Sequence, residues 1–323
     1  MNVDADRESG GPLVTVAIAA FNAGRFLRPS VESILSQTYQ NLEVFVVDDG
    51  STDSSLDSLA RIGDRRLQIL SQPNQGKAVA LNRVMDAAGG TFLALQDADD
   101  ISWPQRIERQ VACLESQPDL AACLTQHDLI VKDRHFAARH EALEREDCAR
   151  IVEQFGLPAM DPTLMCRLSV VGDLRFAPEL RIGQGTDFIL RVGERHPIVV
   201  LGDCVYSYRV DLSSTTRRDP QSTARYVDLV RQRACQRRAL PFDDIHSRAA
   251  GRRPRNAGQH AFIGQVINAT LDDLLAGRRA AAFRTALACA RVRPGSLSSY
   301  KALVYAVAPR RLVLRKRPDR SGP

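Results

Sequence analysis

Short apolar runs that alternate with helical patterns constrain the fold of this chain most. Residues 13–20 are almost continuously apolar, and a second apolar run at 42–47 ends abruptly in the acidic turn 48–51. Between the two runs, the segment after Pro29 carries apolar residues at helical spacing. Strands that are apolar on both faces are typical of parallel sheets covered by helices on each side. The beginning of the chain therefore predicts a strand, a helix and a second, parallel strand.

The same alternation continues through the first third of the chain. The predicted helices lie at 56–60, 77–88 and 107–114, and the predicted strands lie at 67–70 and 91–95. The last of these strands leads directly into a second acidic cluster. Repeated βα units build an open parallel sheet, on which ligands bind beyond the carboxyl ends of the strands. The predicted fold class is therefore α/β, with a Rossmann-like, mostly parallel sheet flanked by helices and both acidic clusters on its ligand-binding edge.

The composition and net charge of the chain limit the classes of partner that it can bind but do not identify one. The 323 residues carry a formal charge of +6 at pH 7, which favours an anionic nucleotide, nucleic acid or lipid. No segment interleaves aromatic residues with arginines, so we expect no nucleic-acid partner. Residues 1–12 lack the basic and apolar blocks of a leader, and no apolar run reaches the roughly 18 residues of a membrane span. We therefore expect a cytoplasmic protein.

The two acidic clusters each allow two interpretations. Asp97 and Asp99, one residue apart at the end of a strand, can hold Mg²⁺ or Mn²⁺ against a diphosphate, or can simply cap the next helix. Asp48 and Asp49 can bind a base N–H or form a tight turn. Together the clusters favour binding, because two acidic loops on one sheet edge can hold a nucleobase and a metal-bound diphosphate at the same time.

Four segments, in this order, resemble the successive motifs of glycosyltransferase family 2. They are Thr-Val-Ala-Ile-Ala-Ala-Phe-Asn at 15–22, Val-Asp-Asp-Gly-Ser at 47–51, Asn-Gln-Gly-Lys at 74–77 and Leu-Gln-Asp-Ala-Asp-Asp at 95–100. The resemblance covers about residues 13–215. It implies a GT-A fold, a nucleoside-diphosphate sugar, a divalent metal (Mn²⁺ or Mg²⁺) and inversion at the anomeric carbon.

Carried over residue by residue, the resemblance implies a donor site. Phe21 would lie beside the nucleobase, Asp49 would accept from the base N–H, and Lys77 would lie near the phosphates. Asp97 would face the ribose or sugar, and Asp99 would ligate the metal, with Asp97 as a second ligand. The full donor-binding set is Ala20, Phe21, Asn22, Asp48, Asp49, Asn74, Gly76, Lys77, Asp97 and Ala98.

The resemblance also implies residues on the acceptor side. Asp187 matches the aspartate that deprotonates the acceptor hydroxyl, and its alternative is a structural aspartate that caps the following helix. Thr186 stands where relatives carry a glutamate. Tyr208 and Arg209 match the segment that follows the base. Asp211 stands where many relatives have a histidine, and it could also coordinate the metal.

These expectations define the organisation and the function of the chain. We expect a disordered N-terminus at 1–12, a GT-A domain at 13–218 with donor and acceptor halves at 13–125 and 126–218, a helical extension at 219–308 and a basic tail at 309–323. Trp103 is the only tryptophan, so the Gln-x-x-Arg-Trp element of processive synthases is absent. We therefore expect a non-processive, inverting glycosyltransferase of cell-surface polysaccharide or glycoconjugate synthesis, with a UDP-sugar donor and a glycan or lipid-linked acceptor. A catalytically idle nucleotide-sugar-binding subunit and a nucleotidyltransferase remain the alternatives.

The C-terminal segment suggests a membrane contact. Residues 297–307 carry apolar side chains at near-helical spacing, and residues 310–317 are rich in arginine and lysine. Such a segment can attach to an anionic membrane surface, which would place the protein peripherally on the inner face of the membrane. The alternative is an apolar face that packs on its own protein beside a solvated tail.

Overall fold

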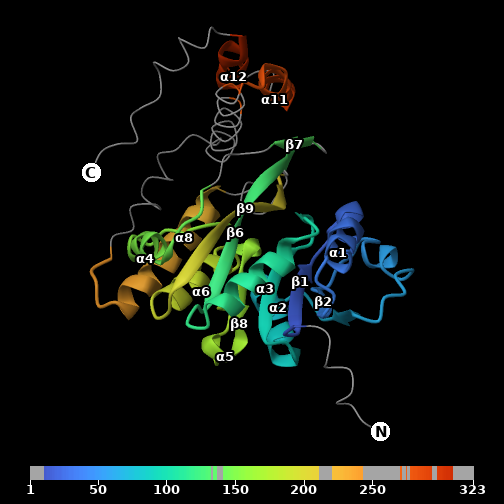
Figure 1. Cartoon of the computed structure of the whole chain (residues 1–323), viewed down its shortest axis with the longest axis vertical. Coiled ribbons are helices and arrows are strands. Elements are labelled where there is room, and N and C mark those ends of the chain that lie inside the picture. The colour runs from blue at the N-terminus through green and yellow to red at the C-terminus, as the bar shows by residue number, and fades with distance from the viewer. Residues whose placement is uncertain are drawn as a thin grey trace.

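A central sheet flanked by helices dominates the computed structural model of the chain (Figure 1). The structure describes residues 11–131, 134–136, 141–210, 220–242, 270, 274, 277–292 and 297–307. Within these residues, nine strands form one sheet, in the order β3-β2-β1-β4-β8-β6-β9-β5, with β7 paired to β6 outside this path. The expected α/β class is therefore confirmed.

The donor half of the sheet is parallel, as the apolar runs predict. Its strands are β1 (Val14–Ala20), β2 (Leu42–Asp48), β3 (Leu67–Ser71) and β4 (Phe92–Asp97). β1 lies between β2 and β4, and the register pairs Ala20 with Asp48 and Ala19 with Asp97. The two acidic clusters therefore follow neighbouring positions on one edge of the sheet. The helix expected at 56–60 is shorter than predicted, a single 3-10 turn (η2, Leu56–Ser58).

The remaining strands introduce antiparallel pairing into the sheet. These strands are β5 (Ile101–Ser102), β6 (Ala122–Val131), β7 (Arg134–Phe136), β8 (Met165–Arg167) and β9 (Ile198–Arg209). β8 is antiparallel to both β4 and β6, and β9 is parallel to β6. β6 and β9 therefore run in the direction of β4, and their carboxyl ends lie at the same edge as the acidic clusters.

Helices cover both faces of the sheet, which explains the continuous apolar runs in its strands. One face packs against α1 (Leu27–Leu35) and α3 (Arg106–Ser116). The other face packs against α2 (Lys77–Ala87), α4 (Arg145–Glu153), α6 (Gln184–Gly193) and α8 (Pro220–Arg237). The short elements η1 (Gly24–Phe26), η3 (Asp161–Thr163) and α5 (Leu168–Val171) connect them.

The helical extension is only partly separate from the sheet. α8 places Val230 and Ala234 in the same apolar cluster as α6, so it belongs to the main body. α11 (Arg279–Val292) and α12 (Leu297–Val307) pack on each other and lie apart from the sheet in Figure 1. Within the described segments, no helix is both long and apolar enough to cross a membrane. The expected disordered N-terminus up to residue 10, most of the extension at 243–276 and the basic tail lie outside the described residues.

One buried arginine fastens the edge where β4 ends. Arg106, in the first turn of α3, is completely buried. Its guanidinium donates to the carbonyl oxygens of Leu95 at 2.7 Å and Pro162 at 2.9 Å. It also donates to the side chains of Gln96 at 3.0 Å and Ser102 at 2.9 Å. A single planar cation therefore joins β4, β5, α3 and η3.

We predict that Arg106→Lys lowers the free energy of unfolding by roughly 2–4 kcal/mol. One ammonium group cannot reach acceptors that lie around a planar guanidinium, and each buried acceptor left unpaired costs about 1–3 kcal/mol. Urea unfolding measures the change. Arg109→Lys is the matched control on the same helix, because Arg109 forms an exposed ion pair with Asp203. Equal losses in the two variants would contradict the central role of Arg106.

Candidate active site

The loop after β1 is tied to the loop after β2. Asn22 adopts a left-handed backbone with φ of 50°. Its backbone N–H donates to Ser51 Oγ at 3.0 Å, and its side-chain oxygen accepts from the Thr52 N–H at 2.7 Å. Phe21, beside it, is 51% exposed, so its ring is open to a ligand. The hydrogen bonds of Asn22 thus hold the two loops together and leave Phe21 accessible.

The acidic turn after β2, at residues 48–51, forms the tight turn that the sequence offered as one of its two interpretations. Asp48 accepts from the Ser51 N–H at 2.9 Å and so closes a tight turn. Asp49 is 3% exposed, and its carboxylate accepts from Gln72 Nε2 and from the N–H groups of Gln75 and Gly76, each at 2.8 Å. Asp49 therefore shapes the loop before α2, and the predicted contact with a base N–H stays a prediction.

Two glycines bring these loops close together. Gly50 has φ of 77°, and a Cβ there would lie 2.8 Å from the backbone nitrogen of Asn74. Gly76 has φ of 97° at the start of α2, and a Cβ there would meet the guanidinium of Arg181 at 2.8 Å. Arg181 was not predicted from the sequence, because no local pattern shows that its loop reaches α2. The donor-side loops thus contact the segment that precedes α6.

The acidic cluster after β4 has the composition of a divalent-metal site. Oxygen atoms of Asp97, Asp99 and Asp100 lie within 4.8 Å of one another. Asp100 is completely buried, and its two oxygens accept from the Tyr206 hydroxyl and from the Arg209 N–H, each at 2.7 Å. The structure thus brings Asp97 and Asp99 together, and their role as metal ligands stays a prediction. Carboxylate oxygens suit Mg²⁺ and Mn²⁺, so these residues fit such an ion.

Lys77 and Asp161 complete this edge. Lys77 Nζ donates to a carboxylate oxygen of Asp97. Burial opposes the charge of Lys77, but attraction to Asp97 and Asp161 outweighs burial and raises its pKa. Burial and the charge of Asp97 raise the pKa of Asp161, against the attraction of Lys77. The sequence did not indicate that Asp161 belongs to this edge, because an aspartate before a proline is typical of a turn.

The structure also shows how Asp161 lies against α6. A Cβ added at Gly185 would come within 2.0 Å of Asp161 Oδ2, so only glycine fits at this position in the first turn of the helix. Asp161 therefore stands between the donor-side residues Lys77 and Asp97 and the beginning of α6. This is where the sequence analysis placed the acceptor side.

Asp187 lies in a different environment from the one expected. It is completely buried, and Arg191 Nε donates to its Oδ2 at 2.8 Å. Arg233 and Arg237, both on α8, donate to its Oδ1 at 3.3 Å each. A base must reach the acceptor hydroxyl, and this carboxylate instead holds α8 against α6. Asp187 is therefore structural, but not as the helix cap expected from the sequence, because it lies inside α6, whose N-cap is Gly183. The base role stays a prediction.

The remaining acceptor-side residues do not gather in one place. Arg209 donates from its Nε to the carbonyl oxygen of Asp99 at 2.8 Å, so it steadies the acidic loop. Tyr208 meets the ring of His127 edge-on, with centroids 6.3 Å apart. Thr186 lines a separate pocket beside α8. Asp211, the additional metal ligand expected from the sequence, lies outside the described residues.

Comparisons with known proteins identify the family and the fold of this chain. A family model described as Glycosyl transferase family 2 matches residues 15–166. EpsE of Bacillus subtilis, named as a glycosyltransferase, is 33% identical over 244 residues, which cover 73% of this chain and 86% of EpsE. The S. aureus TarS 1-349 structure in complex with UDP-GlcNAc is similar with a TM-score of 0.58 at 19% identity, over 91% of this chain and 88% of that chain. The chain belongs to glycosyltransferase family 2, and its fold is similar to the GT-A fold of TarS.

The clustered carboxylates predict a pH-dependent cost in stability. Burial and the charge of Asp97 raise the pKa of Asp99 to about 6. Because an unfolded aspartate titrates near 4, ionising Asp99 costs folding free energy that grows between about pH 4 and 6 and is fully present above it. We predict that Asp99→Asn stabilises the metal-free protein at pH 8, by roughly 1–3 kcal/mol, and not at pH 4.

Thermal unfolding in a chelator checks this effect at both pH values. Asp57→Asn is the control, because Asp57 is exposed in η2 and is not part of the acidic cluster. A melting temperature of Asp99→Asn that equals the wild-type value at pH 8 would show that Asp99 carries no electrostatic cost.

Proposed function

We propose that this chain transfers a sugar from a nucleoside diphosphate to a hydroxyl group of an acceptor. The observation that carries the proposal is the pair Asp97 and Asp99, which meets Lys77 at the carboxyl edge of β4 in a family 2 chain. We favour a UDP-linked donor, because the similar TarS structures contain UDP and UDP-GlcNAc. Phe21 supports the same donor, since its exposed ring stands where a nucleobase can stack.

A divalent metal, Mn²⁺ or Mg²⁺, belongs to this proposal. Asp97 and Asp99 would hold it, and when bound it would neutralise charge on the departing diphosphate. Lys77 adds a fixed positive charge on the same side, because its ammonium group lies against Asp97. The donor phosphates would thus meet two positive charges, and the acceptor would approach from the side of α6.

The group that takes the acceptor proton is the open part of the mechanism. An inverting transfer needs a base opposite the leaving diphosphate. Asp187 is the base by resemblance, but three arginines surround it. Asp161 lies between Asp97 and the first turn of α6, and burial raises the pKa of its carboxyl group, which favours proton uptake. We propose Asp161 as the base and Asp187 as the anchor of α8.

We predict that Asp161→Asn and Asp187→Asn fail in different ways. Asp161→Asn should bind UDP with nearly wild-type affinity in Mn²⁺ and lose transfer by roughly 100- to 10,000-fold, the usual loss for a general base. Asp187→Asn should instead lower the free energy of unfolding by about 3–5 kcal/mol, because it breaks a buried ion-pair network. Single-turnover release of UDP from a panel of UDP-sugars, calorimetry with UDP and urea unfolding measure the three quantities.

The outcomes separate the competing functions. A stable Asp187→Asn protein that binds UDP but transfers no sugar would return the base role to Asp187. UDP binding without any turnover in the wild type would support the idle nucleotide-sugar-binding subunit. Absence of UDP binding, with and without Mn²⁺, would overturn the proposed donor.

We also infer that the C-terminal segment contacts the inner face of an anionic membrane peripherally. There the enzyme would meet a lipid-linked or glycan acceptor of cell-surface synthesis. α12 exposes an apolar face, with Tyr300 41%, Val304 61% and Val307 70% exposed. Exposed apolar side chains on a helix can enter the headgroup region, and basic residues after it add attraction to anionic lipids.

Liposome flotation tests the membrane contact. We predict that the whole chain floats with vesicles rich in anionic phosphatidylglycerol, and that truncation after Pro294 or the double change Val304→Ser and Val307→Ser abolishes flotation. Arg225→Gln is the control, because Arg225 is an exposed residue of α8. Unchanged flotation of the truncated chain would disprove the contact.

A further inference from the structure

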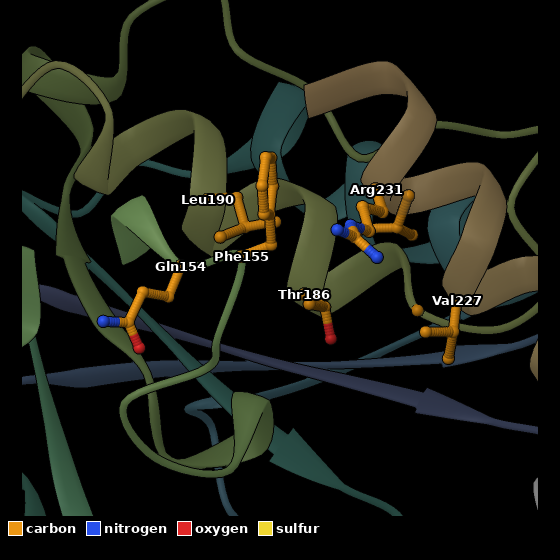
Figure 2. Close-up of a pocket in the computed structure, with 8 residues that line it drawn as sticks. Gln154, Phe155, Thr186, Leu190, Val227 and Arg231 are labelled. Atoms are coloured by element: carbon orange, nitrogen blue, oxygen red, sulfur yellow. The ribbon is translucent and has the colours of Figure 1, made fainter. Parts of the chain in front are cut away.

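A pocket opens between α6, α8 and the end of α4. Its volume is about 270 Å³. Figure 2 shows Thr186 and Leu190 on α6, and Val227 and Arg231 on α8, with Phe155 beside Leu190. Gln154, Gly183 and Val230 complete its lining. This volume is just below the usual range for small-molecule sites, which is about 300–1,000 Å³. The pocket therefore suits one compact ligand rather than a long chain.

The pocket is connected to the donor site through one short segment. Arg181 lies against Gly76 at the start of α2, and Gly185 lies against Asp161. Thr186, the next residue, lines the pocket. The segment 181–186 therefore contacts the donor loops at one end and the pocket at the other. A ligand in the pocket would therefore be connected to the donor loops through this segment.

The pocket wall contains a residue in a costly conformation. Phe155 has φ of 60°, a left-handed backbone that is rare for a bulky side chain and costs about 1–3 kcal/mol. This conformation places the ring in the pocket wall, where two guanidinium groups lie against it, with the guanidinium carbons of Arg238 and Arg231 4.5 Å and 5.4 Å from the ring centroid. The left-handed residue closes the C-terminus of α4, because the N–H groups of Phe155 and Gly156 donate to the carbonyl oxygens of Val152 and Ile151 at 2.9 Å and 2.8 Å. The ring thereby holds Arg231 at the edge of the pocket.

Arg231 differs from its neighbours on α8 in how its charge is balanced. Arg233 pairs with Glu179 and Asp187, and Arg237 and Arg238 pair with Glu194. Within the part of the chain that the structure describes, Arg231 has no carboxylate partner, and its ring contact is with Phe155. A guanidinium group at the edge of a pocket favours an anionic ligand, which it can bind with two parallel hydrogen bonds.

We propose that this pocket seats the acceptor, and that the acceptor is a saccharide unit that carries an anionic group, a phosphate or a carboxylate. The inference rests on the proposed function and names the substrate class of its acceptor side. Leu190 and Val227 cover the apolar face of the sugar, Thr186 and Gln154 bind its hydroxyl groups, and Arg231, held by the ring of Phe155, binds the anion. An acyl chain fits less well, because it would leave these polar groups unpaired.

Binding of three small probes to the whole chain tests the proposal. The probes are glucose 1-phosphate, glucuronic acid and the neutral methyl glucoside, each titrated by saturation-transfer NMR into protein saturated with UDP and Mn²⁺. We expect the anionic sugars to bind and the methyl glucoside to bind more weakly. Arg231→Gln should weaken the anionic sugars about tenfold or more, as expected for loss of a charged hydrogen-bond partner, and leave the methyl glucoside unchanged.

Two further comparisons keep the result interpretable. Thr186→Glu and Thr186→Gln are nearly equal in size, so only the glutamate, which places a negative charge beside Arg231, should weaken the anionic sugars selectively. Arg225→Gln, an exposed change on the same helix, should leave all three affinities unchanged. Melting temperatures of the variants confirm that they fold.

Each result decides one point. Binding of only one anionic sugar supports the proposal and identifies the anion as phosphate or carboxylate. Equal binding of the neutral sugar, or no effect of Arg231→Gln, overturns it. If UDP binds and none of the three sugars does, the acceptor assignment fails while the donor proposal stands. If UDP itself does not bind, the proposed function fails first.

Discussion

The buried guanidinium of Arg106 determines the position of the functional edge of this sheet. A cation removed from water costs several kcal/mol unless hydrogen bonds replace its hydration. Burial lowers the pKa of Arg106 to about 10, so it stays charged at neutral pH and must be satisfied. It is satisfied by the carbonyl oxygens of Leu95 and Pro162, which belong to β4 and η3. The hydrogen bonds of this one guanidinium group therefore hold the end of β4 beside η3. Asp97 and Asp161, which lie close to Leu95 and Pro162 in the chain, are held near each other in the same way.

That edge concentrates negative charge at a cost to the fold. Burial and the neighbouring aspartates raise the pKa of Asp100 well above its usual value, although Tyr206 and the N–H of Arg209 donate to it. Lys77 compensates part of the charge through Asp97. Carboxylates held together against their repulsion are typical of sites that bind cations or move protons. The rigid sheet thus holds these carboxylates together, and their mutual repulsion lowers the stability of the fold.

The sequence predicted the part of the structure that local pattern encodes. The apolar runs gave the parallel strands β1 to β4, and the strand ends placed Asp97 and Asp99 together, because side-chain period and strand direction are local properties. The antiparallel insertion of β8 was not predictable, since its three residues carry no periodic signal. Asp161 was missed for a different reason, because an aspartate before a proline is typical of a turn. The arginines around Asp187 come from α8, and contacts between residues so distant in the chain leave no trace in local pattern.

The departure at Thr186 acquires a physical meaning in this arrangement. Asp187 forms ion pairs with Arg191 of α6 and with Arg233 and Arg237 of α8. These ion pairs hold α8 against α6, where α8 forms one wall of the pocket. A glutamate at 186, as in the family pattern, would line the same pocket as Arg231 and compensate its charge. Threonine leaves that charge for a ligand and offers a hydroxyl group instead. One carboxylate thus anchors α8 on α6. In the proposed acceptor site, the absence of the other would leave Arg231 available to select an anionic group.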